Sequence, residues 1–171
     1  VGEGDAYAHV FEWKGYSAPR ALYRLQKAGV LTKVASQAFS FQTAEGSRTF
    51  SPGTILIPAG IQNISREALE DILQTITQED ALDVYSLDTG YAPLALSLGS
   101  PSFDALQKPE IAILVGDGTR ASNAGEAWFL LDQSYDMDVS LIETDQVSET
   151  LLGRYNTLIM SGGSYAALDS L

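Results

Sequence analysis

The chain has no cysteine and only one histidine, His9, among its 171 residues. Disulfides, thiolate zinc sites and a cysteine nucleophile are therefore excluded within these residues. One histidine without cysteine cannot build a typical zinc site, and no H-E-x-x-H pattern is present. The sequence thus predicts no metal site and no catalytic residue in this chain, and we interpret His9 as part of a strand.

Basic residues are also scarce, since 10 Lys and Arg face 22 Asp and Glu and the net charge is −12. A surface of this sign cannot neutralise phosphates, so nucleic acid is not expected as a partner. No apolar run approaches the length of a membrane span, and the first residues do not have the pattern of a signal peptide. We expect no membrane span, and we attribute most of the acidic residues to a solvated surface.

What the chain does have is apolar runs that end in glycine-rich turns. Residues 111–118 are apolar until a Gly-Asp-Gly turn, which is typical of a buried parallel strand with helices on both faces. Asn123 is the expected N-cap of the helix that follows. Further strands are predicted at 139–142 and 157–160, with a helix capped by Ser148 between them. This alternation predicts a right-handed α/β unit.

The preceding residues alternate in the same way. We predict two flavodoxin- or Rossmann-like halves with mostly parallel strands and flanking helices, the first over 1–88 and the second over 110–171, joined by a connector at 89–109. The second half ends in a predicted helix with no strand after it, so we expect it to be truncated and the chain to be a segment of a longer protein. In the first half we predict strands at 7–13, 30–35, 54–57 and 82–87, helices capped by Ser17 and Ser65, and a β-hairpin excursion near 39–50.

Two turns follow strands that we expect to be neighbours, and their small residues form a candidate ligand site. The first turn also fits the G-x-G-x-x-A pattern of a dinucleotide fingerprint, with Glu143 or Asp145 as its acidic residue. However, Asp117 places a negative charge where a diphosphate would lie, and a plain tight turn is the alternative. The candidate ligand-binding residues are Gly116, Asp117, Gly118, Ser161, Gly162, Gly163 and Ser164.

The second turn also has an alternative interpretation as a nucleophile elbow. Its sequence around Ser164 matches G-x-S-x-G except that the last residue is alanine. A serine nucleophile needs a base, and His9 is the only histidine that could serve. This hydrolase hypothesis is the least favoured of our interpretations.

Two further sets of side chains have both a binding and a structural interpretation. Four carboxylates could line a crevice at the strand ends, but caps and solvated loop charges explain them better. Four aromatic residues could form a binding face, but we interpret them as core. The carboxylates are Glu12, Asp117, Glu126 and Asp145, and the aromatic residues are Trp13, Tyr16, Trp128 and Tyr135.

Three segments carry a resemblance to a known family: I-A-I-L-V-G-D-G, A-G-E-A-W-F-L-L-D-Q-S-Y-D-M, which is the most distinctive, and Y-N-T-L-I-M-S-G-G. They resemble the carboxy-terminal region of bacterial zinc carboxypeptidases, the carboxypeptidase A-like metallopeptidases. Y-A-H-V-F-E-W, G-T-I-L-I-P and L-G-S-P-S-F extend the resemblance over most of the chain. In that family an amidotransferase-like α/β region follows the peptidase domain, so the resemblance implies that residues 110–171 begin a class I glutamine amidotransferase-like fold.

The resemblance further implies a secreted or periplasmic parent that hydrolyses peptide bonds with zinc held by two histidines and a glutamate. None of those residues is carried over, because the chain has a single histidine, His9, so the later zinc-binding histidine is absent, and the amidotransferase cysteine and later histidine are absent too. We therefore expect a non-catalytic accessory α/β segment without a cofactor of its own, which packs on or assists the parent's own peptidase domain. The alternative is a small-molecule binding or amidotransferase-like module with its ligand site at the strand-end turns.

Overall fold

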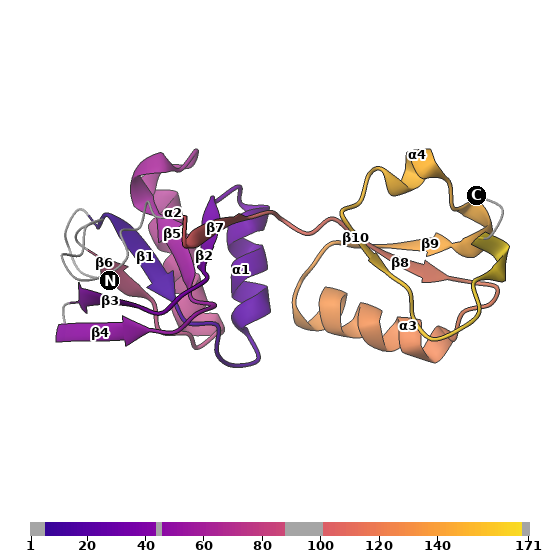
Figure 1. Cartoon of the computed structure of the whole chain (residues 1–171), viewed down its shortest axis with the longest axis horizontal. Coiled ribbons are helices and arrows are strands. Elements are labelled where there is room, and N and C mark those ends of the chain that lie inside the picture. Colours follow the sequence, from indigo (N-terminus) through magenta and orange to yellow (C-terminus); the bar gives the residue numbers. More distant parts are fainter. Residues whose placement is uncertain (1–5, 44–45, 88–100, 169–171) are drawn as a thin grey trace. The chain divides into compact units, whose positions relative to one another are not determined.

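The computed structural model of the chain describes residues 6–43, 46–87 and 101–168 (Figure 1). The chain divides into two compact units, Val1–Gln107 and Lys108–Leu171, which we call the first and the second unit. Their boundary lies inside the predicted connector, of which residues 89–100 are outside the described residues. Within the described ranges, no helix combines the length and the apolar character needed to cross a membrane.

The first unit is built on a five-stranded sheet in which every pair of neighbouring strands is antiparallel. Without the hairpin and β7, its connectivity is β1-α1-β2-β5-α2-β6, the β-α-β-β-α-β plan of ferredoxin-like folds. The strand order is β6 (Tyr85–Leu87), β1 (Ala8–Phe11), β5 (Ile55–Pro58), β2 (Thr32–Ala35) and β7 (Phe103–Leu106). The other elements are α1 (Ala18–Lys27), the hairpin β3 (Phe39–Thr43) and β4 (Gly46–Phe50), a 3₁₀ turn (Ala59–Ile61) and α2 (Arg66–Glu79).

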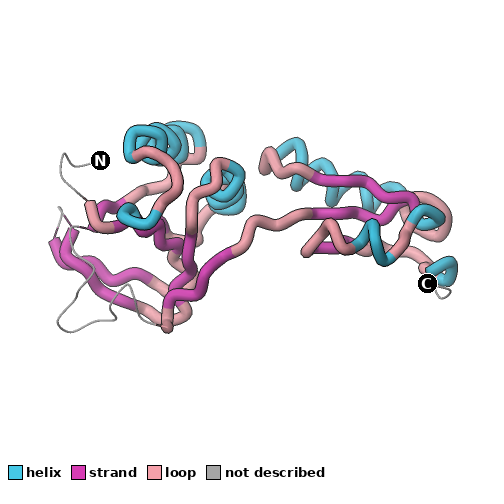
Figure 2. The backbone as a smooth tube through the Cα atoms, turned by 90° about the horizontal axis from the view of Figure 1, so that it is seen from above, coloured by secondary structure: helices cyan, strands magenta, loops and turns pink. Residues whose placement is uncertain are grey.

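Both faces of this sheet are buried. On one face, side chains such as Phe11 and Ile57 pack with Leu25 of α1 and Leu73 of α2. On the other face, the phenylalanines of the hairpin pack against Leu56 and its neighbours. Figure 2 shows the two helices on one side of the strands of this unit. The core therefore has three layers, which are helices, sheet and hairpin.

The prediction of mostly parallel strands is wrong for the first unit. It relied on unbroken apolar runs such as 55–57, which are buried at every position. Such a run indicates that both faces of a strand are covered, and it carries no information on the direction of the neighbouring strands. Here the hairpin predicted near 39–50 provides the second cover. The prediction of a connector through 109 is also wrong for Phe103–Leu106, which pair with β2 as the edge strand β7.

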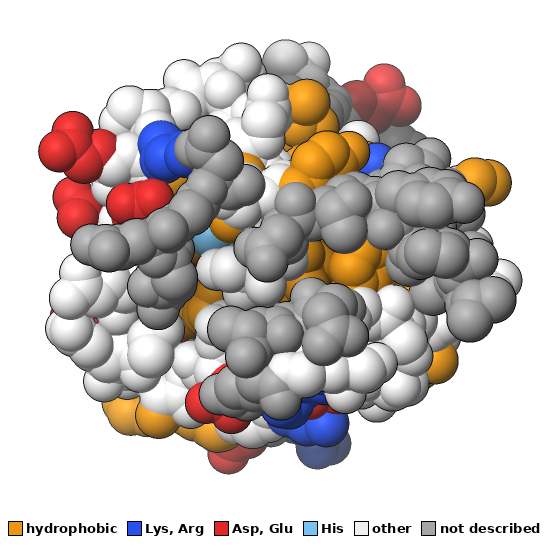
Figure 3. All heavy atoms as spheres, turned by 90° about the vertical axis from the view of Figure 1, so that its left-hand side faces the viewer, with side chains coloured by type: hydrophobic (Ala, Val, Ile, Leu, Met, Phe, Trp, Pro, Cys, Tyr) orange, Lys and Arg blue, Asp and Glu red, His pale blue; other side chains and the backbone are white. Residues whose placement is uncertain are grey.

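Aromatic rings attach the hairpin to the sheet. Phe39 stacks on Phe50 across the hairpin at 5.1 Å between ring centroids, and it meets Phe103 of β7 edge to face at 5.2 Å. Phe50 in turn contacts Tyr85 of β6 at 5.6 Å. Each such pair adds to the free energy gained from burial alone. Figure 3 looks onto this end of the first unit, where hydrophobic side chains are visible in the middle of the face.

The second unit contains a three-stranded parallel sheet with β8 in the centre, so the predicted parallel α/β unit is confirmed here. Helix α3 packs on one face, while α4 and the last turn pack on Ala112 and Leu114 on the other (Figure 1). The strand order is β10 (Thr157–Ile159), β8 (Ile111–Val115) and β9 (Val139–Glu143). The helices are α3 (Ala121–Trp128), its π-helical continuation (Phe129–Ser134) and α4 (Glu149–Leu152), with 3₁₀ turns at Thr144–Gln146 and Ala166–Leu168.

Of the three predicted serine caps, two are confirmed; Ser17 lies at the N-cap position of α1, but its side chain accepts no capping hydrogen bond. Ser65 accepts a hydrogen bond from the Ala68 amide, and Ser148 accepts one from the Leu151 amide, as N-caps do. The prediction of Asn123 as a cap is wrong, because α3 begins two residues earlier at Ala121. The main chain just before this helix is held by a hydrogen bond to the neighbouring turn, which overrides the local signal. Of the helix predicted at 164–171, residues 166–168 form a 3₁₀ turn, and 169–171 are not described.

Candidate functional site

The seven predicted ligand-site residues lie together at the carboxyl ends of β8 and β10. The Arg120 amide donates to the Gly162 carbonyl at 2.8 Å, and the Ser164 amide donates to the Gly118 carbonyl at 2.7 Å. An isolated antiparallel bridge joins Thr119 to Gly163 between these two bonds. The structure therefore places the two turns side by side, as their position after neighbouring strands predicted.

The glycines in these turns are explained by the contact of the turns with each other. Gly118 has φ of +83°, and a Cβ on it would collide with the Ser164 carbonyl oxygen. A Cβ on Gly163 would collide with the Gly118 carbonyl oxygen. Only glycine lets the two backbones approach this closely. The two backbones thus pack directly against each other at these strand ends, and ligand binding by these residues stays a prediction.

The serines of the second turn do not form a nucleophile elbow. Ser164 is exposed and does not have the positive φ that marks a strained turn, which among described non-glycine residues occurs only at Ala81 and Asp136. The hydroxyl oxygen of Ser161 is buried and has no hydrogen-bond partner in the described part of the chain. Its carbonyl accepts a hydrogen bond from the Tyr165 hydroxyl at 2.5 Å, which holds the turn against the core.

His9 belongs to the core of the first unit. It lies on β1 at 4% exposure, paired with Ser86 of β6, and its Nδ1 is 3.2 Å from the Ser86 hydroxyl. Burial, and then the positive charge of Arg66, lower its pKa from 6.5 to about 4. The imidazole is neutral at pH 7 and lies within a sheet, as predicted. These properties do not favour a role as the base of a hydrolase.

An apolar groove lies beside the strand-end turns of the second unit, between α3 and β9. It has a volume of about 260 Å³. Trp128 of α3 and Leu141 of β9 supply its large side chains, and small residues of α3 leave the space between them open. Because Gly116 and Thr119 belong to both the turn and the groove, the predicted site borders this hollow. The groove is lined by Val115, Gly116, Thr119, Ala121, Ala124, Gly125, Trp128 and Leu141.

Two carboxylate residues, Glu143 and Asp117, lie beside Gly116 at one end of this groove. The Glu143 side chain lies against Gly116, so closely that a Cβ there would collide with it. Asp117 is exposed in the turn, and its carbonyl accepts a hydrogen bond from the Thr144 hydroxyl at 2.9 Å. The acidic residue proposed for a dinucleotide fingerprint therefore faces the glycine loop directly. This arrangement opposes a diphosphate at the loop.

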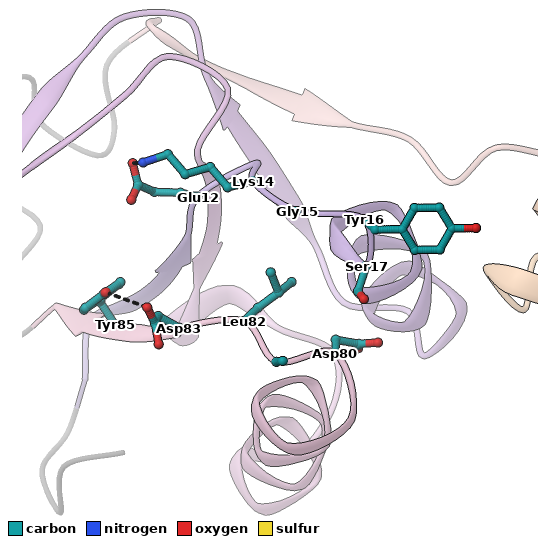
Figure 4. A pocket seen from close by; sticks show the side chains of 10 residues that line it. Glu12, Lys14, Gly15, Tyr16, Ser17, Asp80, Leu82, Asp83 and Tyr85 are labelled. Carbon is teal, nitrogen blue, oxygen red and sulfur yellow. Dashed lines mark hydrogen bonds and ion pairs between the residues drawn. The ribbon is translucent and has the colours of Figure 1, made fainter.

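The first unit contains a polar pocket that the sequence did not reveal. It has a volume of about 390 Å³ and lies between the loop at 12–17 and the segment at 80–85 (Figure 4). Figure 4 shows Glu12 and Lys14 on one wall, and Leu82, Asp83 and Tyr85 on the opposite wall. Charged groups of both signs therefore face one hollow. No local pattern marks it, because its two walls, at 12–17 and 80–85, lie far apart in the sequence.

Glu12 forms ion pairs with two basic side chains at this pocket. Its carboxylate pairs with the Lys14 ammonium at 2.8 Å and with the Arg48 guanidinium at 3.3 Å. The hydrogen bond from Lys14, and a weaker one from Arg48, hold the pKa of Glu12 below its usual value. Arg48 also lies over the Tyr85 ring, 4.0 Å from its centroid. The hairpin that carries Arg48 is thus coupled to the pocket wall.

A buried ion pair supports the base of the same pocket. The Asp80 side chain is fully buried at the end of α2, and its carboxylate lies 2.5 Å from Nε of Arg20 and 3.7 Å from the Arg24 guanidinium. Arg24 also pairs with Glu79 at 2.8 Å. These contacts join α1 to α2.

Two of the aromatic residues interpreted as core are exposed. Trp13 is 46% exposed and Tyr16 is 66% exposed, both in the loop beside the polar pocket. Trp128 and Tyr135 are partly buried. The interpretation as core is therefore wrong for the first pair, whose loop connects β1 to α1 at the surface.

The described residues contain no group of three or more metal-ligating side chains. Comparison of the chain with protein-family models, curated proteins and solved structures finds no match.

Proposed function

We propose that the chain is a non-catalytic accessory region of a zinc carboxypeptidase-like protein, which packs on or assists the peptidase domain of that protein. The observation that carries this proposal is the state of His9, the one histidine of the chain, which is buried, neutral and paired with Ser86. The sequence resemblance supplies the identity of the parent, together with its zinc and its secreted or periplasmic location.

The topology of the second unit supports the amidotransferase-like part of this proposal. Its strand order is β9-β8-β10, which in chain order is 2-1-3. Flavodoxin-like sheets begin with the same order, and their ligands bind where the order reverses, between the first and third strands. In this chain that place is the pair of turns after β8 and β10.

The absence of catalysis is tested with the purified chain and an N-acylated dipeptide with a free carboxyl terminus. We expect no release of the terminal amino acid with added zinc, and the same result with a His9→Ala variant. A pancreatic carboxypeptidase serves as positive control. Zinc-dependent turnover by the chain alone would overturn the proposal.

The identity of the parent is tested by the coding sequence that flanks this segment. An upstream H-x-x-E motif with a later histidine is the expected result, because these residues would hold the zinc. A flanking sequence without a metal set, but with a cysteine and a histidine downstream, would contradict the peptidase assignment and favour an amidotransferase-like enzyme.

A second candidate function is small-molecule binding at the strand-end turns, favoured by the groove that begins at Gly116 and Thr119. A Gly118 variant is a poor test, because the new side chain would collide with Ser164 whether or not a ligand binds. Gly125→Leu is better, since a Cβ on Gly125 has nothing within 4 Å and would project into the groove. We expect loss of ligand-induced thermal stabilisation in Gly125→Leu and its retention in Ser122→Leu. Equal stabilisation of both variants would exclude the groove.

A further inference from the structure

We propose that the apolar groove of the second unit is a docking site for a basic polypeptide segment that inserts one apolar side chain. The partner is a separate peptide or domain whose apolar anchor is flanked by Lys or Arg. This interaction goes beyond the proposed accessory role, since it does not depend on the activity of the parent.

The lining of the groove selects an apolar anchor. Leu141 is 53% exposed on the edge strand β9, which is a high fraction for a central residue of a sheet face. Trp128 faces the same hollow from α3, and tryptophan is enriched at the centre of protein interfaces. Covering these side chains removes apolar surface from water, which drives association.

The size of the groove favours a side chain over a larger ligand. Sites for drug-sized molecules occupy roughly 300–1,000 Å³, whereas this groove measures about 260 Å³. The space exists because Ala121, Ala124 and Gly125 line it from α3 with little or no side chain. One leucine- or phenylalanine-sized group can enter from the open side.

The charge of the second unit selects a basic partner. Residues 108–171 contain ten acidic residues and only three basic ones, Lys108, Arg120 and Arg154. The Glu143 carboxylate lies at the end of the groove, and Asp117 is exposed next to it. Charge complementarity of this kind steers a partner towards the site and disfavours acidic competitors. A segment with Lys or Arg beside its apolar anchor matches both features.

The two tryptophans of the chain allow a direct measurement. A Trp13→Phe background leaves Trp128 as the only indole, and Trp13 is exposed enough for this change to be tolerated. The probe is the amidated hexapeptide Lys-Lys-Leu-Phe-Lys-Lys, titrated at low and high salt. We expect a saturable change in Trp128 fluorescence that weakens as salt rises. The peptide Glu-Glu-Leu-Phe-Glu-Glu should produce no change.

Variants then separate docking in the groove from general attraction to an acidic surface. Gly125→Leu fills the groove without changing the charge, and we expect it to weaken binding roughly tenfold or more. Ser122→Leu places the same side chain on α3 outside the groove and should bind like the parent chain. Leu141→Ser, at an exposed position, removes one wall and should also weaken binding. Circular dichroism melting of each variant confirms that the fold is retained.

Two results would overturn the proposal. If Gly125→Leu and Leu141→Ser bind the basic peptide as tightly as Ser122→Leu, the attraction is non-specific and the groove is not used. If the neutral peptide Gln-Gln-Leu-Phe-Gln-Gln binds as tightly as the basic one at low salt, charge does not select the partner.

Discussion

The two units bury the faces of their sheets with different elements. In the first unit, an antiparallel sheet is covered by two helices on one face and by the hairpin on the other. In the second, a short parallel sheet has α3 on one face and α4 with the last turn on the other, and Leu141 remains half exposed. The strands 55–57 and 111–114 are equally apolar and equally buried. Their comparison shows that a fully apolar strand indicates a sheet buried on both faces. The element that covers a face can be a hairpin as well as a helix.

The largest effect is expected from Phe50→Ala in the hairpin. Phe50 is fully buried between Phe39 and Tyr85, so its loss should lower the unfolding free energy of the first unit by about 4 kcal/mol. Because the residue lies in the core of one unit only, the second unit should keep its stability. Urea unfolding followed by residue-resolved NMR separates the two transitions. Equal loss in both units would show that they unfold as one.

Arg20→Met tests the ion pair at the base of the polar pocket. The change leaves the buried Asp80 carboxylate with only the longer contact to Arg24. Removing one partner of a buried pair is strongly destabilising, and we expect a loss of about 3 kcal/mol in the first unit. The matched control is Arg154→Met in the second unit, where the arginine is exposed. A loss below that of the control would show that the pair does not stabilise the helices.

Gly118→Ala tests the contact between the two turns in the second unit. The new Cβ adds strain at a positive φ and displaces the Ser164 backbone, so about 2–3 kcal/mol should be lost. Gly125→Ala is the control, because its Cβ has open space and the helix favours alanine. Thermal unfolding of the two variants gives the comparison. An unchanged melting temperature for Gly118→Ala would contradict the close approach of the turns.

The smallest expected effect is a loss of stability of the first unit at acidic pH. Because burial lowers the pKa of His9 from 6.5 to about 4, the unfolded chain takes up this proton at higher pH than the folded chain. Stability from this residue is therefore complete above pH 6.5 and is lost as pH falls towards 4. Between pH 7 and pH 5 the first unit should lose about 2 kcal/mol. His9→Gln should remove this loss, as measured by urea unfolding at both pH values, and an identical loss in the variant would assign the effect elsewhere.

Signals that act over a few residues predicted the elements well. Ser65 and Ser148 predicted helix starts because a hydroxyl cap needs only the next turn of backbone. Gly29 follows the end of α1 at Lys27 with φ of +78°, the left-handed conformation in which glycine commonly ends a helix. The close pairing of the turns around Gly118 and Gly163 also followed from their position after strands of a parallel sheet.

Features that depend on contacts between residues far apart in the sequence could not be predicted from such local signals. The polar pocket brings Glu12 together with Asp83, and no periodicity relates positions so far apart in the chain. The cap at Asn123 failed because the Arg120 amide bonds to Gly162, a contact that forms only after the sheet has assembled. Strand direction in the first unit follows from the order and connectivity of the strands, which the apolar runs do not encode.

The acidic surface of the second unit affects whether copies of the chain associate with one another. Strands β9 and β10 both lie at the edges of their sheet, and exposed Leu141, Leu158 and Met160 lie on or beside them. Open edges with apolar side chains are templates for self-association. The surplus of carboxylates makes two such edges repel at neutral pH, and the repulsion fades as pH approaches the pI near 4.2. Colloidal stability of the chain should therefore fall with acid and with salt, even while each unit remains folded.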